Sequence, residues 1–158
     1  MNTFLLYWNP YFSSYKVENF LEDFDFEEER DLLTEDDWGL PVDFNWSIVQ
    51  HDQAHDGDRF FLVRVGLEKP TGMIAAGYIV SEPYEDDDWS GQGRKQFYVD
   101  LEFEEIINPD SDKILATDML SAMIPEVNWE NGRGGWLVPE AVAEKIEALW
   151  ARHLESIW

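Results

Sequence analysis

Three places in the sequence put a tryptophan directly before a small polar residue. The three pairs are Trp8-Asn9, Trp46-Ser47 and Trp89-Ser90. An indole offers a flat face on which another ring can stack, and the neighbouring amide or hydroxyl can hydrogen-bond to the edge of that ring. These six residues are therefore candidate ligand-binding residues.

Each tryptophan also has a purely structural interpretation. Trp8 and Trp46 lie in apolar segments, where packing in the core is the simpler explanation for each residue taken alone. Trp89 lies between an aspartate and a serine in a very polar stretch, so its indole either packs down onto the protein or binds something. Both interpretations stay open from the sequence alone.

The only adjacent basic pair in the chain, Arg94-Lys95, follows Trp89 in the stretch SGQGRK. Glycines let backbone N–H groups face an anion, and two cations beside them favour a phosphate. Alternatively, the pair neutralises the acidic run at residues 85–88 of the same loop. Arg133, in the similar stretch NGRGG, is a further candidate.

The overall charge opposes any nucleic-acid role that lacks a local positive site. The chain has 158 residues, with 34 acidic and 11 basic side chains and a net charge of −23. Such a protein repels phosphates and anionic membranes. The alternative function is therefore an acidic interaction module, or a nucleic-acid mimic, that binds a basic protein.

Metal and catalytic motifs are weak or missing. There is no cysteine, which excludes disulfides and thiolate zinc sites. His51 and His55 have a spacing that suits a metal on a helix, but a connection before the turn at Gly57-Asp58 is the better interpretation. No serine elbow, phosphate-binding loop or dinucleotide fingerprint is present. We expect no cofactor, no metal and no enzymatic activity.

The elements that must position these residues follow from hydrophobic periodicity. We expect strands at residues 3–8, 44–50, 59–65, 73–81 and 97–103, and a loop at 82–96. Helices are expected at 117–123 and, with one apolar stripe, at 139–157, and an acidic helical insertion at 18–37. The sequence predicts one α+β domain over residues 1–158, with a small, mostly antiparallel barrel of five to six strands and a C-terminal helix.

The central block resembles a known family. The matching features are Trp46, Gly57-Asp58, the glycine-rich stretch 72–77, Ser81-Glu82-Pro83-Tyr84 and Val99-Asp100-Leu101. In this order they resemble the EVE domain of the PUA-like superfamily, over residues 3–128. The acidic segment 18–37 and the C-terminal helix, which stands where the family has a basic segment, depart from its pattern.

The resemblance implies a PUA-like barrel and a function. EVE domains and the related YTH domains are readers of modified bases, which they hold in an aromatic pocket, and the related ASCH type can host hydrolytic chemistry. We therefore expect a non-catalytic module that binds a modified or flipped nucleobase or nucleic acid. Residues 1–16 lack the features of a secretory signal, and no apolar run reaches 18 residues, so we expect a cytoplasmic protein that avoids membranes, as a monomer or weak dimer.

Overall fold

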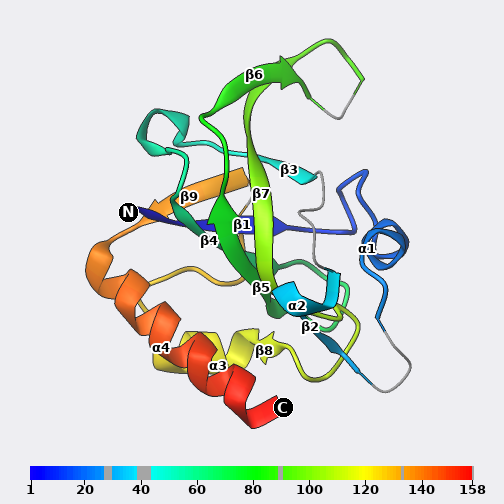
Figure 1. The fold of residues 1–158 in the computed structure, drawn as a ribbon, viewed down its shortest axis with the longest axis vertical. Helices are drawn as coiled ribbons and strands as arrows, with labels where there is room; N and C mark the ends of the chain where they lie inside the picture. The colour runs from blue at the N-terminus through cyan, green and yellow to red at the C-terminus, as the bar shows by residue number, and fades with distance from the viewer. Residues whose placement is uncertain (27–29, 39–43, 89–90, 133, 158) are drawn as a thin grey trace.

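Strand-forming segments from most of the chain join into one mixed sheet in the computed structural model, which describes residues 1–26, 30–38, 44–88, 91–132 and 134–157. The path of hydrogen-bonded neighbours is β2-β7-β5-β4-β1-β9, with β3 and β6 also on β7 and β8 also on β5 (Figure 1). Among the described residues the strands are β1 (Thr3–Trp8), β2 (Leu32–Thr34), β3 (Phe44–Ser47), β4 (Arg59–Arg64), β5 (Gly72–Ile79), β6 (Tyr84–Asp87), β7 (Lys95–Ile107), β8 (Leu115–Ala116) and β9 (Gly134–Val138).

The central strands β1 and β4 run parallel, and every residue of both is buried. Their sequences, TFLLYW and RFFLVR, are largely apolar on both sides of the strand, as a strand covered on both faces requires. The other pairings are antiparallel. One parallel pair therefore sits in an otherwise antiparallel sheet.

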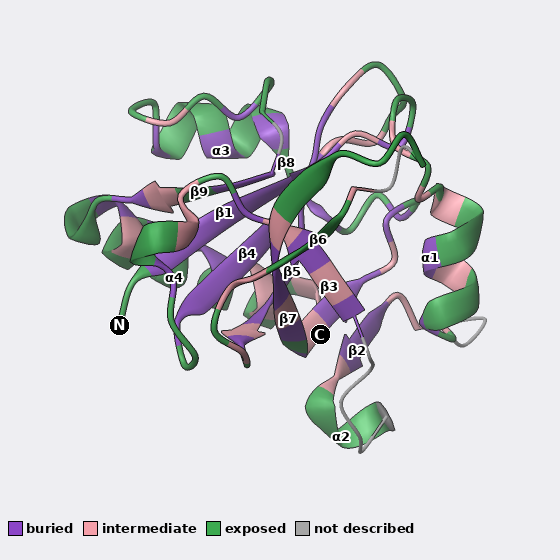
Figure 2. Ribbon diagram, turned by 90° about the horizontal axis from the view of Figure 1, so that it is seen from above, coloured by how far each residue is buried: buried purple, intermediate pink, exposed green. Residues whose placement is uncertain are grey.

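Helices pack around this sheet. They are α1 (Val17–Asp23), α2 (Glu35–Trp38), α3 (Thr117–Met123) and α4 (Glu140–Ile157), with a short 3-10 turn at His51–Gln53. In α4 the buried residues are Val142, Ile146, Leu149 and Trp150, a spacing of three to four that gives one apolar stripe. Figure 2 shows α1 and α4 on opposite sides of the sheet.

Gly77 allows two strands to approach closely. The register between β5 and β7 shifts between Ala76 and Gly77, which marks a bulge. A Cβ at Gly77 would lie 2.0 Å from the carbonyl oxygen of Glu102. The glycine is therefore required because no side chain fits between these backbones.

The α+β class, the mostly antiparallel sheet and the C-terminal helix are confirmed. The sheet differs from the expected barrel of five to six strands, because the described residues form nine strands, six along an open path and three that pair beside it. The acidic segment 18–37 contains α1 and α2 with strand β2 between them, and Leu32 and Leu33 are buried against β7. The expected loop at 82–96 begins as a hairpin in which β6 pairs with β7.

None of the helices in the described ranges has the length and apolar character that a membrane crossing demands.

Candidate functional site

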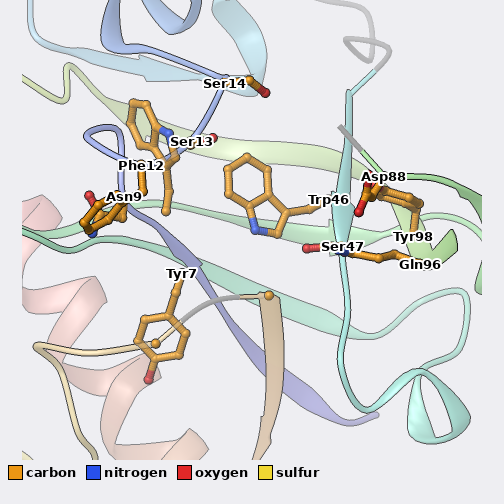
Figure 3. A pocket seen from close by; sticks show the side chains of 13 residues that line it. Tyr7, Asn9, Phe12, Ser13, Ser14, Trp46, Ser47, Asp88, Gln96 and Tyr98 are labelled. Carbon is orange, nitrogen blue, oxygen red and sulfur yellow. The ribbon is translucent and has the colours of Figure 1, made fainter. Parts of the chain in front are cut away.

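A cavity of about 770 Å³ opens where the end of β1, strand β3 and the start of β9 come together. Five of the residues that line it are aromatic, most others are small or polar, and the one charged residue among those described is Asp88. The lining residues are Tyr7, Trp8, Asn9, Phe12, Ser13, Ser14, Trp46, Ser47, Asp88, Gln96, Tyr98, Gly132 and Gly134. Ten of these side chains are labelled in Figure 3.

Trp8 and Asn9 form one wall of this cavity. The Trp8 indole stacks on Phe20, with ring centroids 5.3 Å apart, and its N–H donates to the Tyr15 carbonyl at 2.8 Å. The Asn9 side-chain oxygen accepts from the backbone N–H of Tyr11 at 3.1 Å. Trp8 thus belongs to the core and lines the cavity at the same time, so the two interpretations made from the sequence coexist.

Trp46 and Ser47 come from β3, the strand that pairs with β7. The Trp46 indole is nearly parallel to the Phe44 ring at a centroid distance of 5.9 Å and meets Tyr15 edge-on. Only 4% of Trp46 is exposed, whereas Ser47 is half-buried. In Figure 3 the Trp46 ring lies between Asn9 and Phe12 on one side and the group formed by Ser47, Gln96 and Tyr98 on the other.

Tyr7 closes the floor of the cavity beside the segment that leads into β9. Its hydroxyl donates to the Asn128 carbonyl at 3.1 Å, and burial raises the pKa of Tyr7 to about 12. The backbone at Gly132 lies against the ring, because a Cβ there would be 2.7 Å from Tyr7 ring carbons. Tyr7 therefore stays neutral at physiological pH and is held against the connection between α3 and β9.

The β6–β7 hairpin supplies the third side. The backbone N–H of Asp88 donates to the Arg94 carbonyl at 2.6 Å, and the Tyr98 hydroxyl donates to the Asp87 carbonyl at 3.3 Å. These bonds hold the half-buried Asp88 at the end of β6, next to Gln96 and Tyr98. A carboxylate, an amide and a phenol thus meet at one end of the cavity.

The structure brings four of the predicted site residues together and leaves two outside. Trp8, Asn9, Trp46 and Ser47 all line the cavity, whereas Arg94 and Lys95 do not. The Lys95 ammonium lies 2.6 Å from the Asp87 carboxylate, which raises the pKa of Lys95 and matches the ion pairing considered as the alternative to phosphate binding. Trp89, Ser90 and Arg133 lie outside the described residues.

Several lining residues could not be recognised in the sequence. Phe12 is 79% exposed and follows the turn at Asn9-Pro10. The only sign of it in the sequence was an aromatic residue directly after a strand and a turn, where an apolar side chain tends to be exposed. Gln96 and Tyr98 come close to Ser47 because the β3–β7 register pairs Ser47 with Tyr98. That register is a tertiary property, so no local pattern predicts it.

A second cavity, of about 670 Å³, shares Asn9 and Phe12 with the first. It lies toward the loop between β4 and β5 and toward the start of α3. Within the described part of the chain there is no group of three or more His, Asp or Glu side chains that could hold a metal ion. His51 instead stacks on Phe97 at a centroid distance of 3.6 Å, and the His55 Nδ1 lies 3.1 Å from a Glu82 carboxylate oxygen.

Comparisons with known proteins leave the function open. No family model matches the chain, and no curated protein matches it. Among solved structures it is similar to the YTH domain of the Zygosaccharomyces rouxii MRB1 protein, determined in complex with N6-methyladenosine RNA. That similarity spans 94% of this chain and 86% of the other, with 14% sequence identity and a TM-score of 0.44. A likeness at this level says nothing about the ligands of this chain.

Proposed function

We propose that this protein is a non-catalytic binding module that holds a modified nucleobase in the cavity between β1, β3 and β9. The observation that supports the proposal is the composition of the cavity wall, where two indoles and three other aromatic rings stand beside amide and hydroxyl groups. Aromatic faces stack with a base irrespective of its identity, and the polar groups discriminate its edge.

The dimensions of the cavity agree with this class of ligand. A volume of about 770 Å³ falls in the range of small-molecule sites, roughly 300–1,000 Å³, and is ample for one nucleoside. Asn9, Ser47 and Gln96 offer both hydrogen-bond donors and acceptors. Phe12, which is 79% exposed, offers an open face on which a flipped base or a free nucleoside would stack, whereas the other four aromatic lining residues are only 1–7% exposed.

Tryptophan fluorescence tests the proposal, because Trp8 and Trp46 both line the cavity. Nucleosides with methylated and hydroxymethylated bases would be titrated alongside the unmodified ones at low and moderate salt. We expect saturable quenching by at least one modified nucleoside and weaker quenching by its unmodified parent. If no nucleoside changes the fluorescence at millimolar concentration, the proposal is wrong.

Phe12→Ala makes the same test specific to the cavity. Phe12 is 79% exposed, so its removal leaves the core intact, whereas loss of a stacking ring weakens base binding by about 1–3 kcal/mol. Leu67→Ala is the matched control, because Leu67 is 81% exposed and lines only the second cavity. If Phe12→Ala and Leu67→Ala bind the nucleoside with equal affinity, the nucleoside does not bind in the cavity between β1, β3 and β9.

A further inference from the structure

One peptide bond joins the linings of the two cavities. Asn131 lines the second cavity, and the next residue, Gly132, lines the first. These two residues form the only Asn-Gly pair in the chain. The backbone nitrogen of a glycine that follows an asparagine can approach the asparagine side chain closely, because the glycine has no Cβ to shield it. Whether the two groups react depends on what else holds them.

Both groups are open to reaction in this fold. Asn131 and Gly132 are exposed and lie in the loop between α3 and β9, outside any helix or strand. In the described part of the chain, the side-chain amide of Asn131 and the backbone N–H of Gly132 make no hydrogen bond. The backbone N–H of Asn131 donates to the Asn128 side-chain oxygen at 3.2 Å. The main chain is therefore held in a turn while the two reacting groups have no bond to break first.

Two other exposed places in the fold have similar sequences but lack this freedom. The Asn128 side-chain oxygen accepts from two backbone N–H groups at 3.1 and 3.2 Å, and the large Trp129 follows it. In the pair Asp56-Gly57, the glycine N–H donates to the Ile79 carbonyl at 2.7 Å. Exposure alone therefore does not select the reactive residue, whereas an unbonded glycine nitrogen after an asparagine does.

We infer that Asn131 is a site of spontaneous deamidation, at which the Gly132 nitrogen attacks the side-chain carbonyl carbon. The new C–N bond closes a five-membered imide, the bond to the side-chain nitrogen breaks, and that nitrogen leaves as ammonia with the proton from Gly132. Water then opens the imide, adding hydroxyl to one carbonyl carbon and a proton to the nitrogen. Opening at the side-chain carbonyl gives aspartate. Opening at the main-chain carbonyl gives isoaspartate, whose main chain runs through the former side chain and is one carbon longer.

Either product changes the wall that the two cavities share. Each adds a carboxylate to the lining of the second cavity, which already includes Asp118 and Glu130 and whose one cation among the described lining residues is Lys69. Isoaspartate also lengthens the main chain directly before Gly132, where a Cβ would lie only 2.7 Å from carbons of the Tyr7 ring. Because this contact has no spare room, the longer main chain displaces the Tyr7 ring.

Mass spectrometry of the aged protein tests the site. The purified protein is kept at pH 8 and 37 °C for two weeks, and a second sample is kept at pH 6 and 4 °C. In the first sample Asn131 should become about 1 Da heavier and give both aspartate and isoaspartate, because base removes the proton from the attacking nitrogen. Asn128 is the internal control, and its conversion should be at least about tenfold lower, since the hydrogen bonds on its side chain contribute on this scale. Asn131→Gln should stay unmodified, because its attack would need a larger ring.

Nuclear magnetic resonance of the same samples, without any ligand, tests the change in the wall. A second set of backbone amide signals should appear for Tyr7, across the contact with Gly132, as well as for the chain neighbours of residue 131. The Asn131→Gln protein, aged in the same way, should show one set. An intact Asn131, or equal conversion at Asn128, would overturn the deamidation site, and unchanged Tyr7 signals in the converted protein would overturn the change in the wall. Neither measurement uses a nucleoside, so failure of the proposed function leaves this inference standing.

Discussion

Glu105 on β7 makes the stability of this protein depend on pH in a predictable way. Its side chain is partly buried, and its Oε2 is buried without a hydrogen-bond partner in the described part of the chain. Burial, with a hydrogen bond to Glu104 and the charges of Glu104 and Glu147, raises the pKa of Glu105 to about 8 against the opposing effect of Arg59. This shift favours the protonated form of Glu105 in the folded state at neutral pH.

The sign and size of the effect follow from linkage. The folded state keeps a proton that the unfolded chain releases near pH 4.5, so stability is full below that pH and falls as the pH rises to about 8. The whole pKa difference would correspond to about 5 kcal/mol at about 1.4 kcal/mol per pH unit. Because the side chain is partly exposed to solvent and to screening ions, we expect about 1–2 kcal/mol.

Glu105→Gln removes this dependence, because a glutamine stays neutral and its amide can still donate to Glu104. The free energy of unfolding of the variant should match that of the wild type near pH 4.5 and exceed it by about 1–2 kcal/mol at pH 8. In thermal denaturation followed by circular dichroism this corresponds to a Tm higher by about 3–6 °C. Glu102→Gln, at an exposed position of the same strand, is the control and should show no such difference. A variant-to-wild-type difference that is equal at pH 4.5 and pH 8 would refute this reasoning.

Three further substitutions test the packing of the sheet and, at Gly132, the packing of the cavity. Gly77→Ala should destabilise the fold by at least about 2 kcal/mol, measured by urea denaturation, because its Cβ would overlap the Glu102 carbonyl. Gly132→Ala should displace the Tyr7 ring and weaken nucleoside binding in the fluorescence titration, with little loss of Tm. Unchanged affinity would show that the ligand does not contact the cavity at Tyr7. Arg59→Ala should cost about 3 kcal/mol or more in the same denaturation experiment, since the buried guanidinium pairs with two glutamates and stacks on two aromatic rings, and an effect below about 1 kcal/mol would contradict that assignment.

The sequence predicts the main strands well because each is a continuous or alternating apolar run. β1 was predicted with its exact bounds, and β4 and β5 within one or two residues, since turn signals flank them. β2 could not be predicted from the sequence, because its three residues, LLT, are flanked by acidic residues and form a strand only by pairing with β7. β6 was missed for the same reason: the sequence YEDD has no strand pattern and is held by its partner strand.

The candidate site could also be predicted only in part, where local residue types were enough. The pairs Trp8-Asn9 and Trp46-Ser47 were recognisable because residue type and neighbour suggest stacking and edge recognition. Their meeting in one cavity depends on the position of β3 between β7 and the start of β9, which involves residues far apart in the chain. Asp88 was only one of 34 acids until the structure placed it at the cavity wall.

The most direct test of the central claim is a nuclear magnetic resonance titration of the ¹⁵N-labelled protein with 1-methyladenosine and N6-methyladenosine. If the cavity binds a modified base, chemical shifts should change, saturably, for the indole N–H groups of Trp8 and Trp46 and for the amides of Asn9, Ser47 and Gly134. Signals from α3 and α4 should stay in place. Shift changes centred away from the cavity, or no change at millimolar ligand, would contradict the account.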